Sequence, residues 1–338
     1  MALWRMFWVA GAAAALFLLC RPLLAPAEHP VLSLPIVCEP GKTCFIQSYV
    51  DHDPGEGVAD FACGSATYNA HKGTDFRILS AARVAESVAV VASAEGTVKG
   101  VREGVEDYLI KDGEEARVAN RECGNGVVLD HGNGWETQYC HMRRGSVRVA
   151  KGQSVKRGDR LGDVGYSGLT QFAHVHFELR RGSEVIDPFS GTAKDSVCEK
   201  NPAAQPGFWD GDAAKAFVIS AGDIITAGFA GEAPDEDALE VSDTNVSKLS
   251  AQSPALLLYA RFINLRAGDR IRFTVNGPQG FAEETTSDPL GRNKAGYFGF
   301  FGKRRKEAAW PGGRYEGRIE VLRDRQTLIS RSVSQDLP

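Results

Sequence analysis

The chain has 338 residues, of which 43% are hydrophobic and 24% are charged, and its 37 glycines indicate many turns. This length is sufficient for two domains of ordinary size. The formal net charge of -4 at pH 7 argues against a nucleic-acid partner, because proteins that bind nucleic acids usually carry a basic excess.

Residues 1–27 have the pattern of a secretory signal peptide. Arg5 supplies a positive charge near the start, and an unbroken apolar run extends from residue 7 to residue 20. Two small residues, Ala25 and Ala27, follow this run. A signal peptidase reads these two positions, so we expect cleavage after Ala27 and export across the inner membrane. An uncleaved membrane anchor has the same pattern and stays open. No later segment is apolar for long enough to span a bilayer, so we expect no stable membrane span after signal removal.

Cysteine usage supports export. Removing Cys20 with the signal leaves six cysteines without a Cys-x-x-Cys pair, an even set that indicates disulfides rather than a zinc knuckle. Sequence alone permits many pairings. Local geometry favours two pairs that close short loops, Cys38–Cys44 and Cys123–Cys140. The remaining pair, Cys63–Cys198, would join the two ends of one domain. We expect such an oxidised, exported chain in the periplasm.

Residues 28–65 contain several prolines and glycines, and we predict an irregular segment that packs on the following domain. Between residues 66 and 200, short apolar strands alternate with glycine turns. This pattern predicts mostly antiparallel β structure with little helix. A hairpin turns at residues 132–134, with Cys123 and Cys140 on its two sides. The expected strands cover residues 88–92, 96–101, 127–129, 136–139 and 174–179.

Residues 201–211 have few large aliphatic side chains and are predicted to be a linker. Alternation resumes in residues 212–338, where we expect strands at 256–262, 270–275 and 317–322. Short strands at this spacing predict a β-sandwich-like domain. The basic run at 303–306 lies beside an aromatic strand and is interpreted as a solvated hairpin tip.

Two histidine-containing segments indicate a metal site. In the segment HKGTD, His71 and Asp75 lie four residues apart across a glycine, and in HVH, His174 and His176 lie two apart. Side chains alternate along a strand, so both histidines of HVH are expected on one solvated face. Glu178 shares that face and is interpreted as a residue that orients a ligand or meets solvent.

A catalytic zinc needs three protein ligands and an open position for water. His71, Asp75 and one member of the His174/His176 pair meet that count. Imidazoles with one carboxylate fit zinc better than calcium or copper(I). His131, at the expected hairpin turn, is interpreted as a surface residue.

The ordered set of motifs between residues 68 and 190 resembles the lysostaphin-type (LytM-like) zinc peptidases of bacterial cell walls. The segments that carry the resemblance are HKGTDF at 71–76, GVVLDH at 126–131, TQYCHM at 137–142 and HVHFEL at 174–179, with glycine-punctuated strands at 155–165 and an Asp-Pro pair at 187–188. The chain departs from the family at 171–173, where relatives often have a Gly-Pro-like stretch, and at Cys140.

The resemblance implies the duplicated hybrid motif fold and one zinc ion per chain, held by His71, Asp75 and His176. It also implies that His141 and His174 form the catalytic pair beside the reacting water. Which of the two is the general base stays open.

We therefore expect a mainly β protein with an antiparallel LytM-like domain at 66–200 and a C-terminal β-sandwich-like domain at 212–338. The expected activity is that of a zinc metalloendopeptidase that hydrolyses peptidoglycan cross-links or stem peptides. A catalytically silent regulator, a wall-binding module and a zinc peptidase with protein substrates stay open. The C-terminal domain is expected to bind wall, recruit a regulatory protein or cover the active-site groove.

Overall fold

The computed structural model describes Met1 and residues 29–198, 207–216 and 222–338. The predicted signal peptide, from residue 2 onward, and residues 201–206 of the predicted linker lie outside the described residues. Within the described ranges, no helix has both the length and the apolar character needed to cross a bilayer.

The described chain is mostly antiparallel β structure, as predicted, and its helices are short. Helices α1 and α2 cover Gly211–Ala216 and Glu236–Val241, and a 3₁₀ helix, η1, covers Ala81–Glu86. Further 3₁₀ segments cover Glu115–Val118 and Pro278–Gly280. The strands are β1 Cys44–Ser48, β2 Thr74–Ile78, β3 Ala89–Val91, β4 Gly96–Arg102, β5 Asn125–Gly132, β6 Trp135–Met142, β7 Ser154–Val155, β8 Arg160–Asp163, β9 His174–Arg181, β10 Glu184–Ile186, β11 Asp223–Ala230, β12 Ala255–Leu265, β13 Arg270–Asn276, β14 Ala282–Thr286, β15 Lys294–Arg304, β16 Gly313–Arg323 and β17 Gln326–Leu337.

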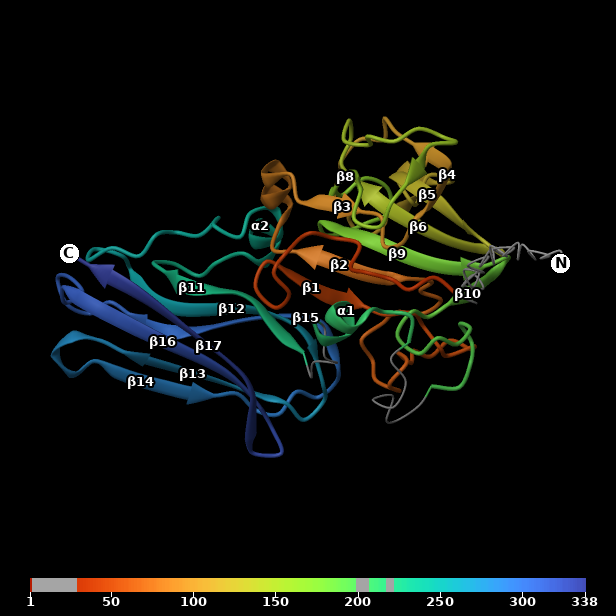
Figure 1. The fold of residues 1–338 in the computed structure, drawn as a ribbon. Helices are drawn as coiled ribbons and strands as arrows, with labels where there is room; N and C mark the ends of the chain where they lie inside the picture. The colour runs from red at the N-terminus through yellow and green to blue at the C-terminus, as the bar shows by residue number, and fades with distance from the viewer. Residues whose placement is uncertain (2–28, 199–206, 217–221) are drawn as a thin grey trace.

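An eight-stranded antiparallel sheet forms the centre of the N-terminal domain, in the order β1-β2-β9-β6-β5-β4-β7, with β10 paired to β9 (Figure 1). Strands β3 and β8 pair separately. Strand β9 supplies Val175, Phe177 and Leu179 to the core, and each is at most 1% exposed. Burying a side chain of this size stabilises the fold by roughly 1.5–3 kcal/mol. The alternate positions of β9 therefore carry its polar side chains on the opposite face.

The segment predicted as irregular, residues 28–65, contains strand β1, which that prediction missed. β1 pairs with β2 at the edge of the eight-stranded sheet, opposite Phe76 and its neighbours. Phe45 and Ile46 of β1 are buried, and so is Leu32 earlier in the segment. The edge of a sheet offers unpaired backbone groups, so a short apolar run beside prolines still forms a strand there.

The predicted linker also contributes to the core. Trp209 is 5% exposed, and its ring centroid lies 6.1 Å from that of Phe76 and 5.6 Å from that of Phe177. Leu32 and Trp209 form a parallel β-bridge. The chain therefore packs on the N-terminal domain once more before it enters β11.

The C-terminal strands form two antiparallel sheets that pack face to face, as the β-sandwich prediction requires. One sheet has the order β11-β12-β15 and the other has the order β14-β13-β16-β17. A single apolar core lies between them, with Leu258 and Phe262 from the first sheet and Phe273 and Ile319 from the second.

Apolar and charged contacts join the two domains. Phe45 of β1 clusters with Ile225 and Ile263 of the C-terminal domain. Arg83 of η1 donates to Asp243, with Nη2 2.6 Å from Oδ2. Figure 1 shows α2 between the C-terminal sheets and the N-terminal domain. The C-terminal domain is thus fastened to the domain that carries the predicted ligands.

All three predicted disulfides are present: Cys38–Cys44, Cys63–Cys198 and Cys123–Cys140. The second bond joins residues 135 positions apart. In the chain-entropy description, closing a long loop removes more freedom from the unfolded chain than closing a short one.

Candidate active site

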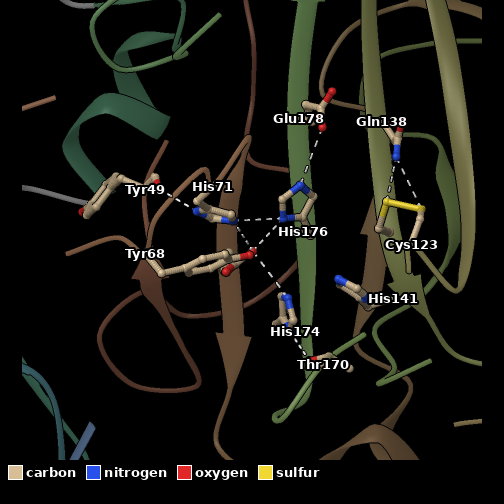
Figure 2. A network of polar contacts seen from close by, with 12 residues as sticks. Tyr49, Tyr68, His71, Cys123, Gln138, His141, Thr170, His174, His176 and Glu178 are labelled. Atoms are coloured by element: carbon tan, nitrogen blue, oxygen red, sulfur yellow. Dashed lines mark hydrogen bonds and ion pairs between the residues drawn. A yellow bond between two sulfur atoms is a disulfide. The ribbon is translucent and has the colours of Figure 1, made fainter. Parts of the chain in front are cut away.

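The pairing of two neighbouring strands brings the predicted ligands together. β2 and β9 are antiparallel, and Asp75 lies directly opposite His176 in their register. His71 precedes β2 in a turn, where its backbone N–H donates to the carbonyl of Tyr68 at 3.1 Å. Figure 2 shows the rings of His71 and His176 pointing toward one another.

The three side chains offer ligand atoms at the spacing of a metal site. Nε2 of His71 lies 3.2 Å from Oδ1 of Asp75 and 3.1 Å from Nδ1 of His176, and the last two atoms are 2.8 Å apart. Ligand atoms placed about 2.0 Å from a tetrahedral ion are about 3.3 Å apart, so the observed set fits such an ion.

The tautomer of His71 follows from its second ring nitrogen. Nδ1 lies 2.6 Å from the carbonyl oxygen of Tyr49. A carbonyl oxygen only accepts, so Nδ1 carries the proton and donates it. The lone pair of Nε2 is then free to bind a metal.

The surroundings of the cluster favour positive charge. His71 and Asp75 are 1% and 2% exposed. Burial raises the pKa of Asp75, but His71 and His174 lower it more, so it lies well below its ordinary value. Burial lowers the pKa of His176, but its hydrogen bond to Asp75 and the nearby charge of Glu178 outweigh this and raise it to about 9. The two carboxylates therefore create an environment that suits a cation.

His141 and His174 lie next to each other beside this cluster (Figure 2), with ring centroids 4.6 Å apart. Nε2 of His174 is 3.4 Å from Oδ1 of Asp75. Nδ1 of His141 donates to the carbonyl of Ser167 at 2.8 Å, and Nδ1 of His174 donates to the carbonyl of Phe172 at 2.9 Å. Each ring is therefore held in the tautomer whose Nε2 can accept a proton.

The backbone of His141 is in the left-handed region, with φ of 61°, which is uncommon for a residue other than glycine. Its N–H donates to the carbonyl of Cys123 at 2.8 Å. Burial, with additional effects of His174 and His176, lowers the pKa of His141 well below its ordinary value. The imidazole is therefore neutral near neutral pH, which leaves its Nε2 lone pair available, and unusual backbone geometry of this kind clusters at active sites.

The face of β9 that carries the histidines is not solvated, contrary to the prediction. His174 is 4% exposed and Glu178 is 7% exposed. Oε2 of Glu178 lies 3.9 Å from Nε2 of His176, and Oε1 accepts from Arg180 at 3.1 Å. Of the two interpretations of Glu178, this geometry favours the orienting one.

His131 lies outside the cluster. Its Nδ1 is 2.6 Å from the carbonyl oxygen of Glu95, and its Nε2 is 2.8 Å from Oγ1 of Thr137. The ring therefore links β5 to the residue before β4 and to β6, and it is only partly exposed.

Sequence reasoning missed the groups that orient these side chains. Three of them are the backbone carbonyls of Tyr49, Ser167 and Phe172, and no residue type marks a carbonyl. Tyr68 was also missed: its ring stacks on His71 with centroids 4.2 Å apart, although the residue is 54% exposed. An aromatic residue three positions before His71 was the available signal.

The Cys123–Cys140 disulfide ends directly before His141, and we expect its removal to weaken the fold. Replacing both cysteines with serine should lower the free energy of unfolding by about 3 kcal/mol, as expected for a bond that closes a loop of this size, given the separation of 17 residues. Urea unfolding measures this change. The matched control is the Cys38→Ser/Cys44→Ser pair, whose separation is 6, with a smaller expected loss of about 2 kcal/mol. Equal stability of the Cys123→Ser/Cys140→Ser protein and the original would contradict the expectation.

Known proteins resemble the same part of the chain. Residues 69–188 match peptidase family M23. An uncharacterised metalloprotease of Haemophilus influenzae is 30% identical over 122 residues, which are 36% of this chain and 20% of that protein. The peptidoglycan DD-endopeptidase ShyA of Vibrio cholerae is 38% identical over 90 residues, which are 26% of this chain and 20% of that protein. The chain thus spans about a fifth of the length of these curated relatives.

Among solved structures, the catalytic domain of a mutant of EnpA, a prophage-encoded M23 protein from Enterococcus faecalis, is 22% identical. The TM-score is 0.31, and the match covers 48% of this chain and 95% of that one.

Proposed function

We propose that the protein is an exported zinc metalloendopeptidase that hydrolyses peptide bonds in peptidoglycan, because residues 69–188 match peptidase family M23. One observation carries the proposal: three ligand atoms, from His71, Asp75 and His176, meet at one point of the sheet, and His141 and His174 lie beside them. The proposed bonds are those of cross-links or stem peptides, since one similar protein is named a peptidoglycan DD-endopeptidase.

His71, Asp75 and His176 would hold one zinc ion. Two imidazoles and one carboxylate are a donor set that suits zinc and leaves an open position for water. A bound zinc ion would polarise the scissile carbonyl and lower the pKa of water. Glu178 would keep the ring of His176 in its orientation through Nε2.

His141 and His174 would move the protons of the reaction. Each ring has its Nδ1 occupied by a backbone carbonyl and offers Nε2 to the reacting groups. One ring would take the proton of the attacking water and deliver it to the leaving amine. The other, once protonated at Nε2, would donate a hydrogen bond to the oxygen that gains negative charge.

We propose the periplasm as the location, because the N-terminal pattern is that of an export signal and the three disulfides require an oxidising compartment. Residues 212–338 would contact wall polymer or a regulatory protein. The net charge of -4 argues against a nucleic-acid partner, because proteins that bind nucleic acids usually carry a basic excess.

Incubation of the purified protein with isolated peptidoglycan tests the proposal, with released fragments analysed by mass spectrometry. We expect new amine termini that identify the cleaved bond, their loss after chelation, and their return with zinc. A His176→Ala sample should release none. If the protein has zinc bound and its disulfides formed but releases no fragments, the proposed peptidase activity is wrong and a regulatory role is favoured. Cleavage of a protein substrate without release from wall would overturn the proposed substrate.

Gly73 lies between the proposed ligands and tests the packing of the metal site. A Cβ at this position would lie 2.5 Å from the carbonyl oxygen of Phe177 and 2.6 Å from Nε2 of His176. We expect Gly73→Ala to displace that ring and lower zinc affinity by roughly 10- to 100-fold, the range for disturbed ligand support. Competition with a chromogenic chelator measures this. At Gly100 a Cβ meets nothing within 4 Å, so Gly100→Ala should keep the original affinity, and equal affinities for all three proteins would contradict the expectation.

A further inference from the structure

Resting on the proposed function, we infer that Glu240 of the C-terminal domain positions the catalytic ring of His174, acting through Arg77 and Phe172. The C-terminal domain would then take part in the reaction without touching substrate. Each of these residues is a positioning residue, because each acts on His174 and not on the reacting atoms.

Phe172 contacts His174 in two ways. Its ring stacks on the imidazole with centroids 4.4 Å apart and planes 28° from parallel. Its carbonyl oxygen accepts the hydrogen bond from Nδ1 at 2.9 Å. Thr170 assists, since its Oγ1 donates to the same carbonyl at 2.7 Å and lies 3.1 Å from Nδ1. The place of Phe172 therefore sets both the tilt and the tautomer of His174.

Arg77 also contacts the ring of Phe172. Its guanidinium carbon lies 4.9 Å from the centre of the Phe172 ring. The register of β2 and β9 places Arg77 directly opposite His174, so the stack bridges two neighbouring strands. Arg77 is 4% exposed, and a buried guanidinium is held in place only while its donors are satisfied.

Glu240 supplies the counter-charge of Arg77 and accepts from its Nη2. Nη2 of Arg77 lies 2.8 and 2.9 Å from the two carboxylate oxygens of Glu240, and Nη1 donates to Gln47 at 2.7 Å. Glu240 lies on α2 and also accepts from Arg261 of β12. Without its carboxylate, Arg77 and Arg261 would be two buried cations with no shared counter-charge, and each would be drawn away from its present place.

Two variants test this arrangement: Glu240→Gln, which removes the counter-charge, and Phe172→Leu, which removes the stacked ring outside the domain interface. Misplacing a catalytic group by about 1 Å can cost about 100-fold. We expect each variant to lower kcat by roughly 10- to 100-fold, with KM within about 2-fold and zinc content unchanged. Phe172→Tyr restores the ring and should restore kcat. Asp237→Asn makes the same carboxylate-to-amide change on an exposed position of α2 and should change nothing.

A second readout does not depend on turnover. In the zinc-loaded protein, the Nδ1–H proton of His174 should give a hydrogen-bonded imidazole signal by ¹⁵N-edited NMR, assigned with His174→Ala. We expect that signal to broaden or shift in Glu240→Gln and in Phe172→Leu. If folded Phe172→Leu keeps both the original NMR signal and the original kcat, the inference is wrong, whatever Glu240→Gln shows. If the original protein releases no peptide, the proposed function fails, and the NMR signals alone decide whether Glu240 positions His174.

Discussion

Replacing His71 with alanine should remove the bound zinc and lower the rate of peptide-bond hydrolysis by at least about 10³-fold. His71 is proposed to provide one of the three ligand atoms through Nε2, because its Nδ1 donates to the carbonyl of Tyr49, and alanine offers no ligand atom in its place. A Lewis acid contributes several kcal/mol to transition-state stabilisation. Zinc per chain, measured by elemental mass spectrometry, and release of amine termini from peptidoglycan check the two parts.

His29 provides the matched control for this substitution. Its ring stacks on Phe208 with centroids 4.2 Å apart, and it lies outside the ligand cluster. His29→Ala should keep both zinc and activity. A His71→Ala protein that retains a full zinc ion would remove His71 from the ligand set.

Replacing His174 with alanine should also lower activity but should leave the zinc bound. We expect kcat to fall by roughly 10²- to 10⁴-fold, the usual contribution of a positioned acid or base. His174 lies beside the metal cluster, and its Nε2 faces Asp75 at 3.4 Å, yet the ligand distances are satisfied by His176. The same measurements apply, with circular dichroism to establish that the variant is folded.

His141→Ala should behave like His174→Ala, because the two rings are proposed to act on the same step, one as proton acceptor and the other as hydrogen-bond donor. Residues that act as a unit are strongly non-additive, so the double variant should be scarcely slower than either single variant. Loss of zinc from His174→Ala would instead make His174 a ligand, which is the choice that the residues alone left open between the two histidines of HVH.

Much of the fold could be predicted because local patterns produced it. The hairpin of β5 and β6 follows from two short strand patterns around a glycine turn, and Cys123 and Cys140 on its two sides then pair. Strand β1 and Trp209 could not be found in this way. β1 is a short run flanked by prolines and depends on the free edge of β2, while Trp209 depends on contacts with Phe76 and Phe177.

The candidate site could also be predicted only in part. The spacing of His71 and Asp75 and the HVH repeat are visible in the sequence, and the pairing of β2 with β9 brings them together. The burial of His174 could not be read from strand alternation, because alternation separates two faces without saying what covers each. The pair Arg77–Glu240 joins residues 163 positions apart, and neither residue carries a local sign of its partner.

Trp209 and β1 have a practical consequence for anyone who trims this chain. A fragment cut at the family limits, residues 69–188, would lack the edge strand, the Trp209 ring over Phe76 and Phe177, and both halves of the Cys63–Cys198 bond. Its apolar surface would be uncovered where those groups now pack. A piece from residue 29 to residue 216 keeps all of them, so the stretch that packs together is longer than the stretch that matches the family.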